Sequence, residues 1–336
     1  MLKIKCTVAI MVCVLLCGTA ASQVAFVYSL PKTALKIEVT VEKTIEKPGE
    51  FYQYAQRYLA TNNVITAEKT TCKIVSVNVT AQTRPNPAHT YSLNSLVNKN
   101  LSISVDGEGI LTGLNNFVEN KNIEVADETK APLSKHQPAT DLLPLIEEYM
   151  MASSISKMAE GAAKQIYHIR EGRMSLLSGD VSVFPQGSAM GDLLRRMDEQ
   201  EQALAELFTG KRITSLETAT IYFDPAQTAV NQPLFRLSNT NGVVAADDLS
   251  GSPVYIRLNV DSKSQVNSAV KAAVALYYVL PVNGTIVIDD GKNQYFTGEF
   301  TFPQFGTVLP LGENVLTKST RRVLIDNTTG RLLGIE

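Results

Sequence analysis

The residues best suited to hold a metal ion are His168 and Glu171, which lie three positions apart in a segment with a helical pattern. This spacing places both side chains on one face of a helix. A metal site needs at least a third ligand, and the chain has no His-Glu-x-x-His motif. We therefore treat the pair as a weak metal candidate and favour a solvated polar face shared with Arg170 and Arg173.

Two acidic pairs, Asp247-Asp248 and Asp289-Asp290, have side chains that could serve a glycosidase or bind calcium. Each pair stands beside Gly or Ser in a predicted turn, where aspartate commonly accepts hydrogen bonds from backbone N–H groups. Neither pair has the spaced oxygen ligands of a calcium loop, and the geometry of a glycosidase pair is set in space. A role in turns is the interpretation we favour.

Motifs for nucleophilic catalysis are missing from the sequence. The segment Gly187-Ser188-Ala189-Met190-Gly191 has the wrong order for a nucleophile elbow, and Ser188 is predicted to cap a helix. Cys72 stands in an apolar strand pattern and is predicted to be a small core residue. His89 and His136 lie in proline-containing segments and are expected at the surface. The sequence predicts no catalytic residue and no cofactor.

An aromatic group near residue 50 could bind a sugar or a peptide. Helical spacing places Phe51, Tyr54 and Tyr58 on one face that is expected to pack in the core. Tyr52 does not share this face and is the member of the group that could contact a ligand. The absence of tryptophan weakly disfavours a carbohydrate-stacking surface. The residues that we expect on a ligand or partner surface are Tyr52, Arg170, Arg173, Asp247 and Asp248.

Residues 1–22 have the three parts of a secretory signal: a basic start, an apolar run over residues 6–17 and small residues at 18–22. The apolar run is shorter than the ~20 residues that a membrane span needs. We therefore expect cleavage after Ala21 or Ser22 rather than an uncleaved anchor. The predicted location is the periplasm or the cell surface, including association with the outer membrane.

The charge balance limits the classes of partner. Lys and Arg number 31 and Asp and Glu 33, for a net charge of −2. Nucleic-acid-binding proteins carry a basic patch, so we expect no nucleic-acid partner. Hydrophobic residues make up 44% and charged residues 19% of the chain, which is typical of a folded protein. No later apolar run reaches spanning length, so no transmembrane span is expected after signal cleavage.

The region from 23 to 145 reads as a β-rich domain with a short helix. Apolar and polar residues alternate over Leu35–Ile45 and again over Thr71–Ala81, with Val75 and Val77 among the residues expected to face inward. Between them, Glu50–Ala60 has helical spacing and is expected to pack on the sheet. Further predictions are an end to the second strand at Arg84-Pro85-Asn86-Pro87, a hairpin over 101–114 and a loop over 127–144.

Residues 146–211 have a different period. Apolar residues recur at steps of three and four from Met151 to a predicted stop at Gly179, and again from Met190 to Gly210. The short connection between the two segments predicts an antiparallel helical hairpin. Such regular apolar stripes need a packing partner.

Residues 212–336 return to strand patterns and predict an antiparallel sandwich or barrel. The fold class is therefore α+β, with β-rich N-terminal and C-terminal domains and an intervening helical hairpin. The expected strands are 218–223, 254–260, 273–280, 285–288, 294–302 and 322–325, with turns at 241–242, 283–284, 289–291 and 327–330.

An internal similarity links the two ends of the chain. Residues 105–114 and 325–335 share an aspartate, a turn glycine and a following leucine. We favour two hairpins with the same turn chemistry, and a duplicated β domain is the alternative.

Several segments spread along the mature chain carry a resemblance to a known family. These segments are Tyr28-Ser29-Leu30-Pro31-Lys32-Thr33, Pro48-Gly49, Tyr54-Ala55-x-Arg57-Tyr58-Leu59, Ala162-Ala163-x-x-Ile166-Tyr167-x-Ile169-Arg170-Glu171-x-Arg173, Leu176-Leu177-x-Gly179 and Leu207-Phe208-Thr209-Gly210. On these segments the mature chain resembles the domain of unknown function 4831 family of exported bacterial proteins over nearly its whole length. The resemblance implies export and a shared fold, and the family brings no assigned activity.

Three functional hypotheses follow from these patterns. The leading one is an exported, non-enzymatic protein of the envelope or surface that binds or scaffolds a protein or glycan partner. The first alternative is a secreted hydrolase acting on glycan or peptide, and the second is a structural subunit of a surface assembly whose strand edges accept a partner strand.

Overall fold

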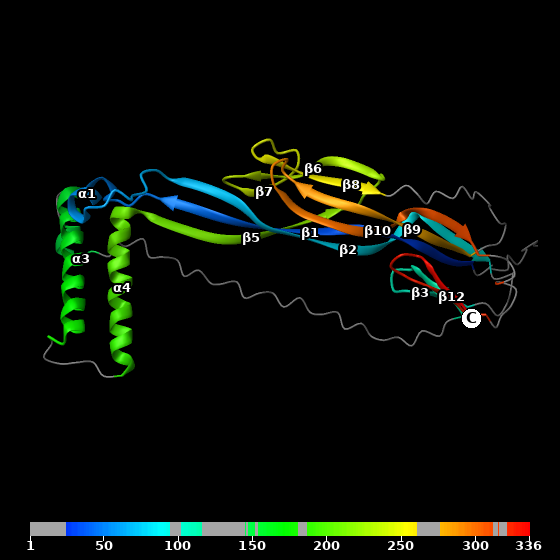
Figure 1. Ribbon diagram of the computed structural model, residues 1–336, viewed down its shortest axis with the longest axis horizontal. Coiled ribbons are helices and arrows are strands. Elements are labelled where there is room, and N and C mark those ends of the chain that lie inside the picture. Colours follow the sequence, from blue (N-terminus) through cyan, green and yellow to red (C-terminus); the bar gives the residue numbers. More distant parts are fainter. Residues whose placement is uncertain are drawn as a thin grey trace, which may run out of the picture.

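The computed structural model describes residues 25–94, 102–115, 145, 147–151, 154–180, 187–260, 276–311, 315 and 321–336. The fold is α+β, as predicted, and the molecule is elongated. Long strands form its body, and a pair of helices stands at one end (Figure 1). The predicted leader, the predicted loop over 127–144 and His136 lie outside the described residues.

The first sheet contains the longest strands and has the order β2-β1-β5. Strand β1 spans Ala25–Lys47, β2 spans Lys69–Asn94 and β5 spans Lys211–Phe223. Both neighbours run antiparallel to β1. The predicted alternation in β1 is confirmed, since its apolar residues Leu35, Ile37, Val39 and Val41 are all buried.

Strand β2 departs from the prediction in two ways. Thr40 of β1 pairs with Ser76, but the next residue, Val41, pairs with Ile74. Val75 is therefore left without a partner on β1 and is the extra residue of a β-bulge. The inward-facing set therefore changes at this point, and Val75 is 55% exposed whereas Val77 is buried. The predicted end of the strand at residues 84–87 is also wrong. Prolines are tolerated in a strand at a sheet edge or bulge, and β2 continues through them to Asn94.

The second sheet has five strands in the order β10-β9-β8-β6-β7. Its members are β6 (Ala229–Ser238), β7 (Gly242–Val244), β8 (Ser252–Val260), β9 (Tyr277–Asp289) and β10 (Gln294–Pro310). The expected turn at Asn283-Gly284 is wrong, because both residues pair with β10 inside the continuous strand β9. Strands β6 and β7 were missed by the alternation pattern, and the predicted turn at Asn241-Gly242 is the connection between them.

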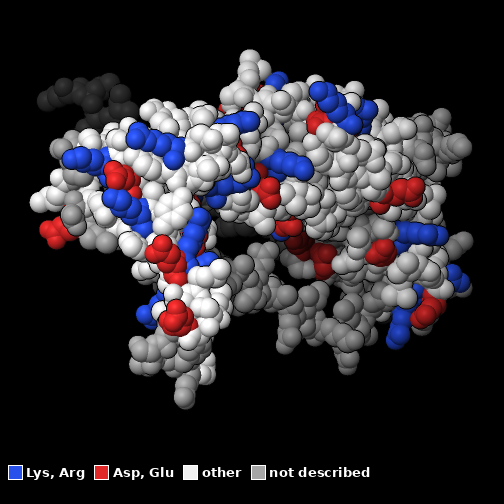
Figure 2. All heavy atoms as spheres, turned by 60° about the vertical axis from the view of Figure 1, so that its left-hand side comes forward, with Lys and Arg blue, Asp and Glu red and all other residues white. Residues whose placement is uncertain are grey.

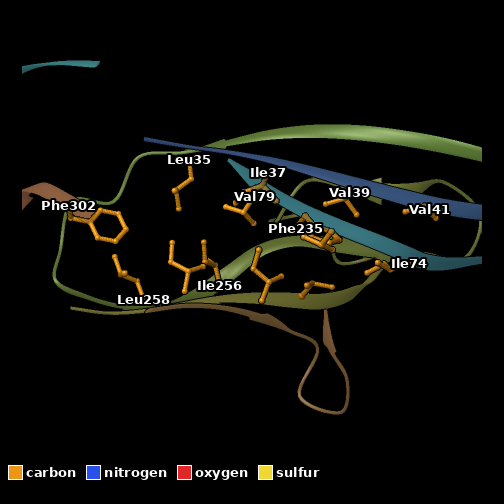
Figure 3. Packing of buried hydrophobic residues seen from close by; sticks show 14 of the residues in the cluster. Leu35, Ile37, Val39, Val41, Ile74, Val79, Phe235, Ile256, Leu258 and Phe302 are labelled. Atoms are coloured by element: carbon orange, nitrogen blue, oxygen red, sulfur yellow. The ribbon is translucent and has the colours of Figure 1, made fainter. Parts of the chain in front are cut away.

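The main core lies between these two sheets. Apolar side chains from β1 and β2 point toward those of the five-stranded sheet, including Phe235, Ile256 and Leu258 (Figure 3). At one edge, Gln304 forms a second link by accepting a hydrogen bond from the Thr33 N–H at 2.9 Å and donating one to the Thr33 carbonyl at 2.8 Å. Face-to-face burial of two apolar sheet surfaces is the dominant stabilising contribution in such a body.

The third sheet joins the two similar segments noted in the sequence. Strands β3 (Ile103–Val105), β4 (Leu111–Leu114), β11 (Val323–Ile325) and β12 (Leu332–Ile335) have the order β12-β11-β4-β3. The two hairpins therefore lie side by side. Their turns use the same chemistry, because Asp106 and Asp326 each accept backbone hydrogen bonds and a glycine closes each turn at positive φ.

Two long helices form the predicted antiparallel hairpin. Helix α3 spans Ile155–Ser178 and follows a short helix, α2, at Glu147–Met150. Helix α3 ends, as predicted, at Gly179, whose φ of 78° is favourable for glycine because glycine has no Cβ atom. Helix α4 spans Ser188–Thr209 and has Gly187 as its N-cap, so the predicted capping role of Ser188 is wrong.

The predicted helix over residues 50–60 is present in shorter form. A 3₁₀ turn, η1 (Tyr52–Tyr54), leads into α1 (Ala55–Leu59). The expectation that this segment packs on the sheet is wrong, since Phe51 and Ala55 are buried in a cluster with residues of α3 and α4. The apolar face of the segment thus provides the partner that the helical stripes require.

Strands from the N-terminal and C-terminal regions pair with each other. Strand β5 joins the sheet of β1 and β2, and β11 pairs with β4. The proposed boundaries at residues 145 and 211 therefore separate segments of sequence that share sheets. The division of the chain into an N-terminal and a C-terminal β domain at these boundaries stays a prediction.

Candidate functional site

A network of charged side chains lies between α3 and α4. Arg170 Nε donates to Glu201 Oε1 at 2.7 Å, and Arg173 Nη2 donates to Glu201 Oε2 at 2.6 Å. Arg173 Nη2 also lies 2.5 Å from Asp198 Oδ1. Glu201 is thus held between two guanidinium groups across the helix interface, and the side chain is mostly buried there. These charge-assisted hydrogen bonds fix the relative position of the two helices.

An open groove of about 450 Å³ runs beside this network. Apolar atoms form most of its lining, and Met174 and Leu177 supply its apolar wall. Met174 is 69% exposed and Leu177 is 64% exposed, although both lie on an amphipathic helix. The charged members of the lining are Arg170, Glu171, Arg173 and Glu201.

The groove is open because the η1–α1 segment, which packs on the apolar face of α3, is shorter than that helix. In the first half of α3, residues such as Ala162 and Ile166 are buried in the cluster that includes Phe51 and Ala55 of the η1–α1 segment. Beyond Ile166, Leu176 is the only buried residue of α3. The apolar stripe of α3 therefore continues past the end of its cover and reaches solvent.

The predicted residues Arg170 and Arg173 belong to this site, and the groove residues Met174, Leu177 and Glu201 were not singled out. The apolar residues whose spacing predicts the first long helix do not include Met174 or Leu177, although both lie inside the predicted helical segment. A pattern of this kind identifies the apolar face of a helix but does not tell how far a partner covers it.

The weak metal candidates are in contact with each other but fully at the surface. His168 Nδ1 lies 3.5 Å from Glu171 Oε2, and the side chains are 80% and 75% exposed. Within the part of the chain that the structure describes, no group of three or more His, Cys, Asp or Glu side chains is arranged to hold a metal ion. The pair has the geometry of a solvated helix surface.

The remaining predicted surface residues lie on other elements. Tyr52, in η1, is partly exposed, and its hydroxyl accepts a hydrogen bond from Gln53 Nε2 at 3.2 Å. Asp247 and Asp248 follow β7 in the loop to β8. Asp248 Oδ1 accepts from the Ser250 N–H at 2.9 Å, and this hydrogen bonding lowers the pKa of the Asp248 carboxyl. The structure does not bring these residues together with Arg170 and Arg173 in one site.

The second acidic pair serves the turn between β9 and β10. Asp289 Oδ1 accepts hydrogen bonds from Arg257 Nη2 and from the Gly291 N–H, both at 2.9 Å. Asp290 accepts from the backbone of Lys292 and Asn293 and from the Tyr295 hydroxyl. These carboxylates are engaged by the fold itself, which agrees with the predicted turn role.

Hydrogen bonding at this turn shifts two pKa values in opposite directions. Burial opposes ionisation of Asp290, but the hydrogen bonds from Tyr295 and the turn backbone outweigh it and hold the Asp290 pKa well below its usual range. Burial and the hydrogen bond to Asp290 raise the pKa of Tyr295 to about 12. The turn is therefore stabilised by a carboxylate that stays ionised over the physiological range.

His89 is less exposed than the sequence predicted. Its Nδ1 lies 3.2 Å from the Tyr91 hydroxyl, and its ring stacks on that of Tyr91. Burial lowers the pKa of the imidazole. Tyr91 in turn stacks on Tyr277, so His89 ends an aromatic row that joins β2 to β9.

Charges of both signs are interspersed on the face of the molecule that presents the helical end. Figure 2 shows basic and acidic side chains alternating over this face. Helices in the described ranges all lack the combination of length and apolar character needed to cross a membrane.

A family model described as Domain of unknown function (DUF4831) matches residues 25–333. No curated protein and no solved structure matches the chain. The matched range begins with β1 and ends within β12, so it includes all three sheets and the helical hairpin. The chain belongs to the domain of unknown function 4831 family.

Proposed function

We propose that this protein is an exported, non-enzymatic binding or scaffolding protein of the bacterial envelope, and that the groove between α3 and α4 is its binding surface. The observation that carries the proposal is the open apolar groove, in which Met174 and Leu177 are more than half exposed beside a fixed charge network. Exposed apolar residues that are contiguous and rimmed by charge are typical of interaction sites.

The construction of the groove suits binding more than catalysis. Its carboxylate and guanidinium groups neutralise one another in ion pairs of 2.5–2.7 Å. A general acid or base needs a proton that it can exchange with a substrate, and Glu201 is already engaged by two arginines. The acidic pairs that motivated the hydrolase alternative hold turns, so no observation in the described part of the chain favours that alternative.

Export rests on the leader pattern in the sequence. A basic start, a short apolar run and small residues precede the first strand. The elongated body of long strands agrees with a protein that spans distance or presents a surface (Figure 1). This part of the proposal is independent of the groove.

Photo-crosslinking in living cells tests the binding surface. A photoreactive phenylalanine analogue at Leu177 is expected to give a discrete adduct, whereas the same analogue at Leu249, which is 80% exposed in the loop between β7 and β8, is expected to give none. Equal labelling at both positions, or no adduct at Leu177, would contradict the proposal.

A structural subunit is the second candidate function, and one feature favours it. Strand β5 has 13 residues and forms the edge of its sheet, and no described residue pairs with its outer side. A long free edge can accept a strand of another chain. Thr218→Pro would remove a backbone donor from β5, and loss of assembly in envelope fractions with retained monomer folding is the outcome expected for this role.

A further inference from the structure

We propose that Asn241 is a site of spontaneous deamidation, at which the folded chain converts a side-chain amide to a carboxylate without an enzyme. The proposal is independent of the groove between α3 and α4. It is carried by the Asn241-Gly242 dipeptide, by the unengaged Asn241 amide in the turn between β6 and β7, and by the contrast with a second Asn-Gly dipeptide at residues 283–284.

The reaction needs only these two residues and water. Hydroxide removes the proton from the Gly242 backbone nitrogen, which then attacks Cγ of Asn241. A bond between these two atoms closes a five-membered succinimide ring, the bond from Cγ to the amide nitrogen breaks, and ammonia leaves with a proton from water. Glycine favours this attack because it has no Cβ to crowd the ring.

Water then opens the succinimide at either of its two carbonyl carbons. Cleavage of the new bond gives aspartate, and cleavage of the original peptide bond gives isoaspartate, in which the main chain runs through the side-chain carbons. The net reaction exchanges an amide for a carboxylic acid, consumes water and releases ammonia. Isoaspartate is therefore the chemical mark of this route.

The side chain of Asn241 is available for the attack. Asn241 lies in the turn and is exposed, and its backbone N–H donates to Ser238 Oγ at 3.4 Å. Its side-chain amide forms no hydrogen bond with any residue that the structure describes. A Cβ added to Gly242 would meet only Glu217 Oε2, at 3.6 Å, which is an ordinary contact distance. Space for the ring is therefore present.

Ring closure also requires the backbone at Gly242 to move, because Gly242 is buried and pairs with Ser238. Strand β7 has only three residues, and the Ser238–Gly242 pair is the one next to the turn. The end of a short hairpin opens at a small cost in free energy. Gly242 can thus reach the reactive conformation without opening of the rest of the sheet.

Asn283-Gly284 has the same sequence in surroundings that prevent this motion. Both residues pair with β10 inside β9, and Gly284 also pairs with β8 on the other side. Asn283 Oδ1 accepts a hydrogen bond from Thr301 Oγ1 at 3.0 Å. Ring closure here would require the interior of the sheet to open, which costs much more free energy than fraying of a hairpin end. We expect Asn241 to react at least about tenfold faster than Asn283.

Isoaspartate at this position would disturb the turn, because it lengthens the main chain. The turn is held in part by Cys72 Sγ, which donates to the Asn239 carbonyl at 3.3 Å. Val243, which follows the dipeptide, packs against the core between the two large sheets. The isoaspartate form is therefore expected to have a lower melting temperature than the unmodified protein.

Peptide mass spectrometry of the purified full chain, incubated below its melting temperature, tests the proposal. Conversion at Asn241 should give both aspartate and isoaspartate, should exceed conversion at Asn283 by about tenfold or more, and should become faster as the pH is raised. In denaturant the two dipeptides should react at similar rates, because only the fold distinguishes them.

Asn241→Gln is the resistant variant, since a longer side chain must close a six-membered ring, and its loss of a free amide leaves no hydrogen bond to replace. Asn283→Gln is the matched control and should leave the rate at Asn241 unchanged. Equal rates at the two asparagines in the native protein, or an intact Asn241 under conditions that deamidate the denatured chain, would overturn the inference.

Discussion

Asp290 shows how a single carboxylate can organise a turn without taking part in chemistry. Its two oxygens accept hydrogen bonds from Lys292, Asn293 and Tyr295, which lie in the turn and at the start of β10. The sequence feature that suggested a glycosidase or a calcium site is thus explained by local backbone geometry. Ionisation of Asp290 and stability of the turn are coupled, because each hydrogen bond favours the charged form.

Tyr295→Phe is expected to raise the Asp290 pKa toward its usual value, since the variant removes a hydrogen bond of 2.6 Å to Oδ2. The folded-state pKa of Asp290 is depressed, so its stabilisation is fully present above the unfolded pKa of about 4 and is lost as pH falls through the folded value. The variant should therefore lose about 1 kcal/mol near pH 7 and a smaller amount in acid.

Carboxyl-resolved NMR titration and chemical denaturation at several pH values measure these two effects. Tyr278→Phe is a suitable control, because Tyr278 lies elsewhere, in β9. An Asp290 pKa that does not move in the Tyr295 variant would show that the backbone donors alone set its value.

At the scale of elements, a β-bulge decides which residues of β2 face the core. The side chains of a strand alternate between its faces, and one extra residue reverses the set that points inward. Cys72 and Ile74 are buried before the bulge at Val75, and Val77 and Val79 are buried after it. The uninterrupted alternation expected from the sequence had placed Val75 inside.

Valine-to-alanine substitutions on the two sides of the bulge should have different costs. Val77→Ala removes buried methyl groups and is expected to reduce the free energy of unfolding by about 1–3 kcal/mol. Val75→Ala, at a residue that is 55% exposed, should change it by less than about 0.5 kcal/mol. Denaturant unfolding of both variants measures the difference, and equal losses would contradict the observed register.

Gly49 lies between the end of β1 and the η1 turn, where the backbone passes close to the C-terminal end of α4. The Cα of Gly49 lies so close to the end of α4 that an added methyl group would overlap the Leu207 carbonyl. The neighbouring Phe51 N–H donates to the same carbonyl at 2.7 Å, so neither backbone segment can move away without losing this hydrogen bond.

Gly49→Ala should therefore destabilise the protein by about 1–3 kcal/mol, measured by thermal or denaturant unfolding. Gly191→Ala is the matched control, because an added methyl group there meets nothing within 4 Å. Since Gly191 lies inside α4, its replacement should stabilise the helix by up to about 1 kcal/mol. A Gly49 variant as stable as the wild type would contradict the close approach.

The whole molecule combines a body of paired sheets with a helical hairpin at one end. The body is held by a core between two sheets and by strand pairing between distant parts of the chain, and the hairpin is held by the η1–α1 segment and Gly49. We propose that the body presents the hairpin outside the cytoplasm, where the groove is available to a partner.

The proposed export predicts where the mature protein begins. Mass spectrometry of the protein from its native cells should find an N-terminus at Ser22 or Gln23, as expected for cleavage after Ala21 or Ser22. Substituting Ala21 with a bulky residue such as Tyr should slow the removal of the leader. A protein that retains Met1 and fractionates with the cytosol would contradict export and leave the description of the fold unchanged.

The features that were predicted correctly from the sequence are those that depend on local physics. Alternation identified β1, helical spacing identified α3 and α4, and a glycine with positive φ ended α3 where predicted. Arg170 and Arg173 were also expected at a polar surface, because charged residues three positions apart lie on the same face of a helix.

Which apolar faces pack against each other could be learned from the three-dimensional structure alone. The pairing of β5 with β1, the bulge at Val75 and the uncovered stripe at Met174 and Leu177 all depend on contacts between residues far apart in the chain. Periodicity shows that a strand or helix has an apolar face, but not which segment covers it or where the cover ends. The groove is therefore a property of the assembled fold, although all of its residues lie in segments that the sequence predicts to be helical.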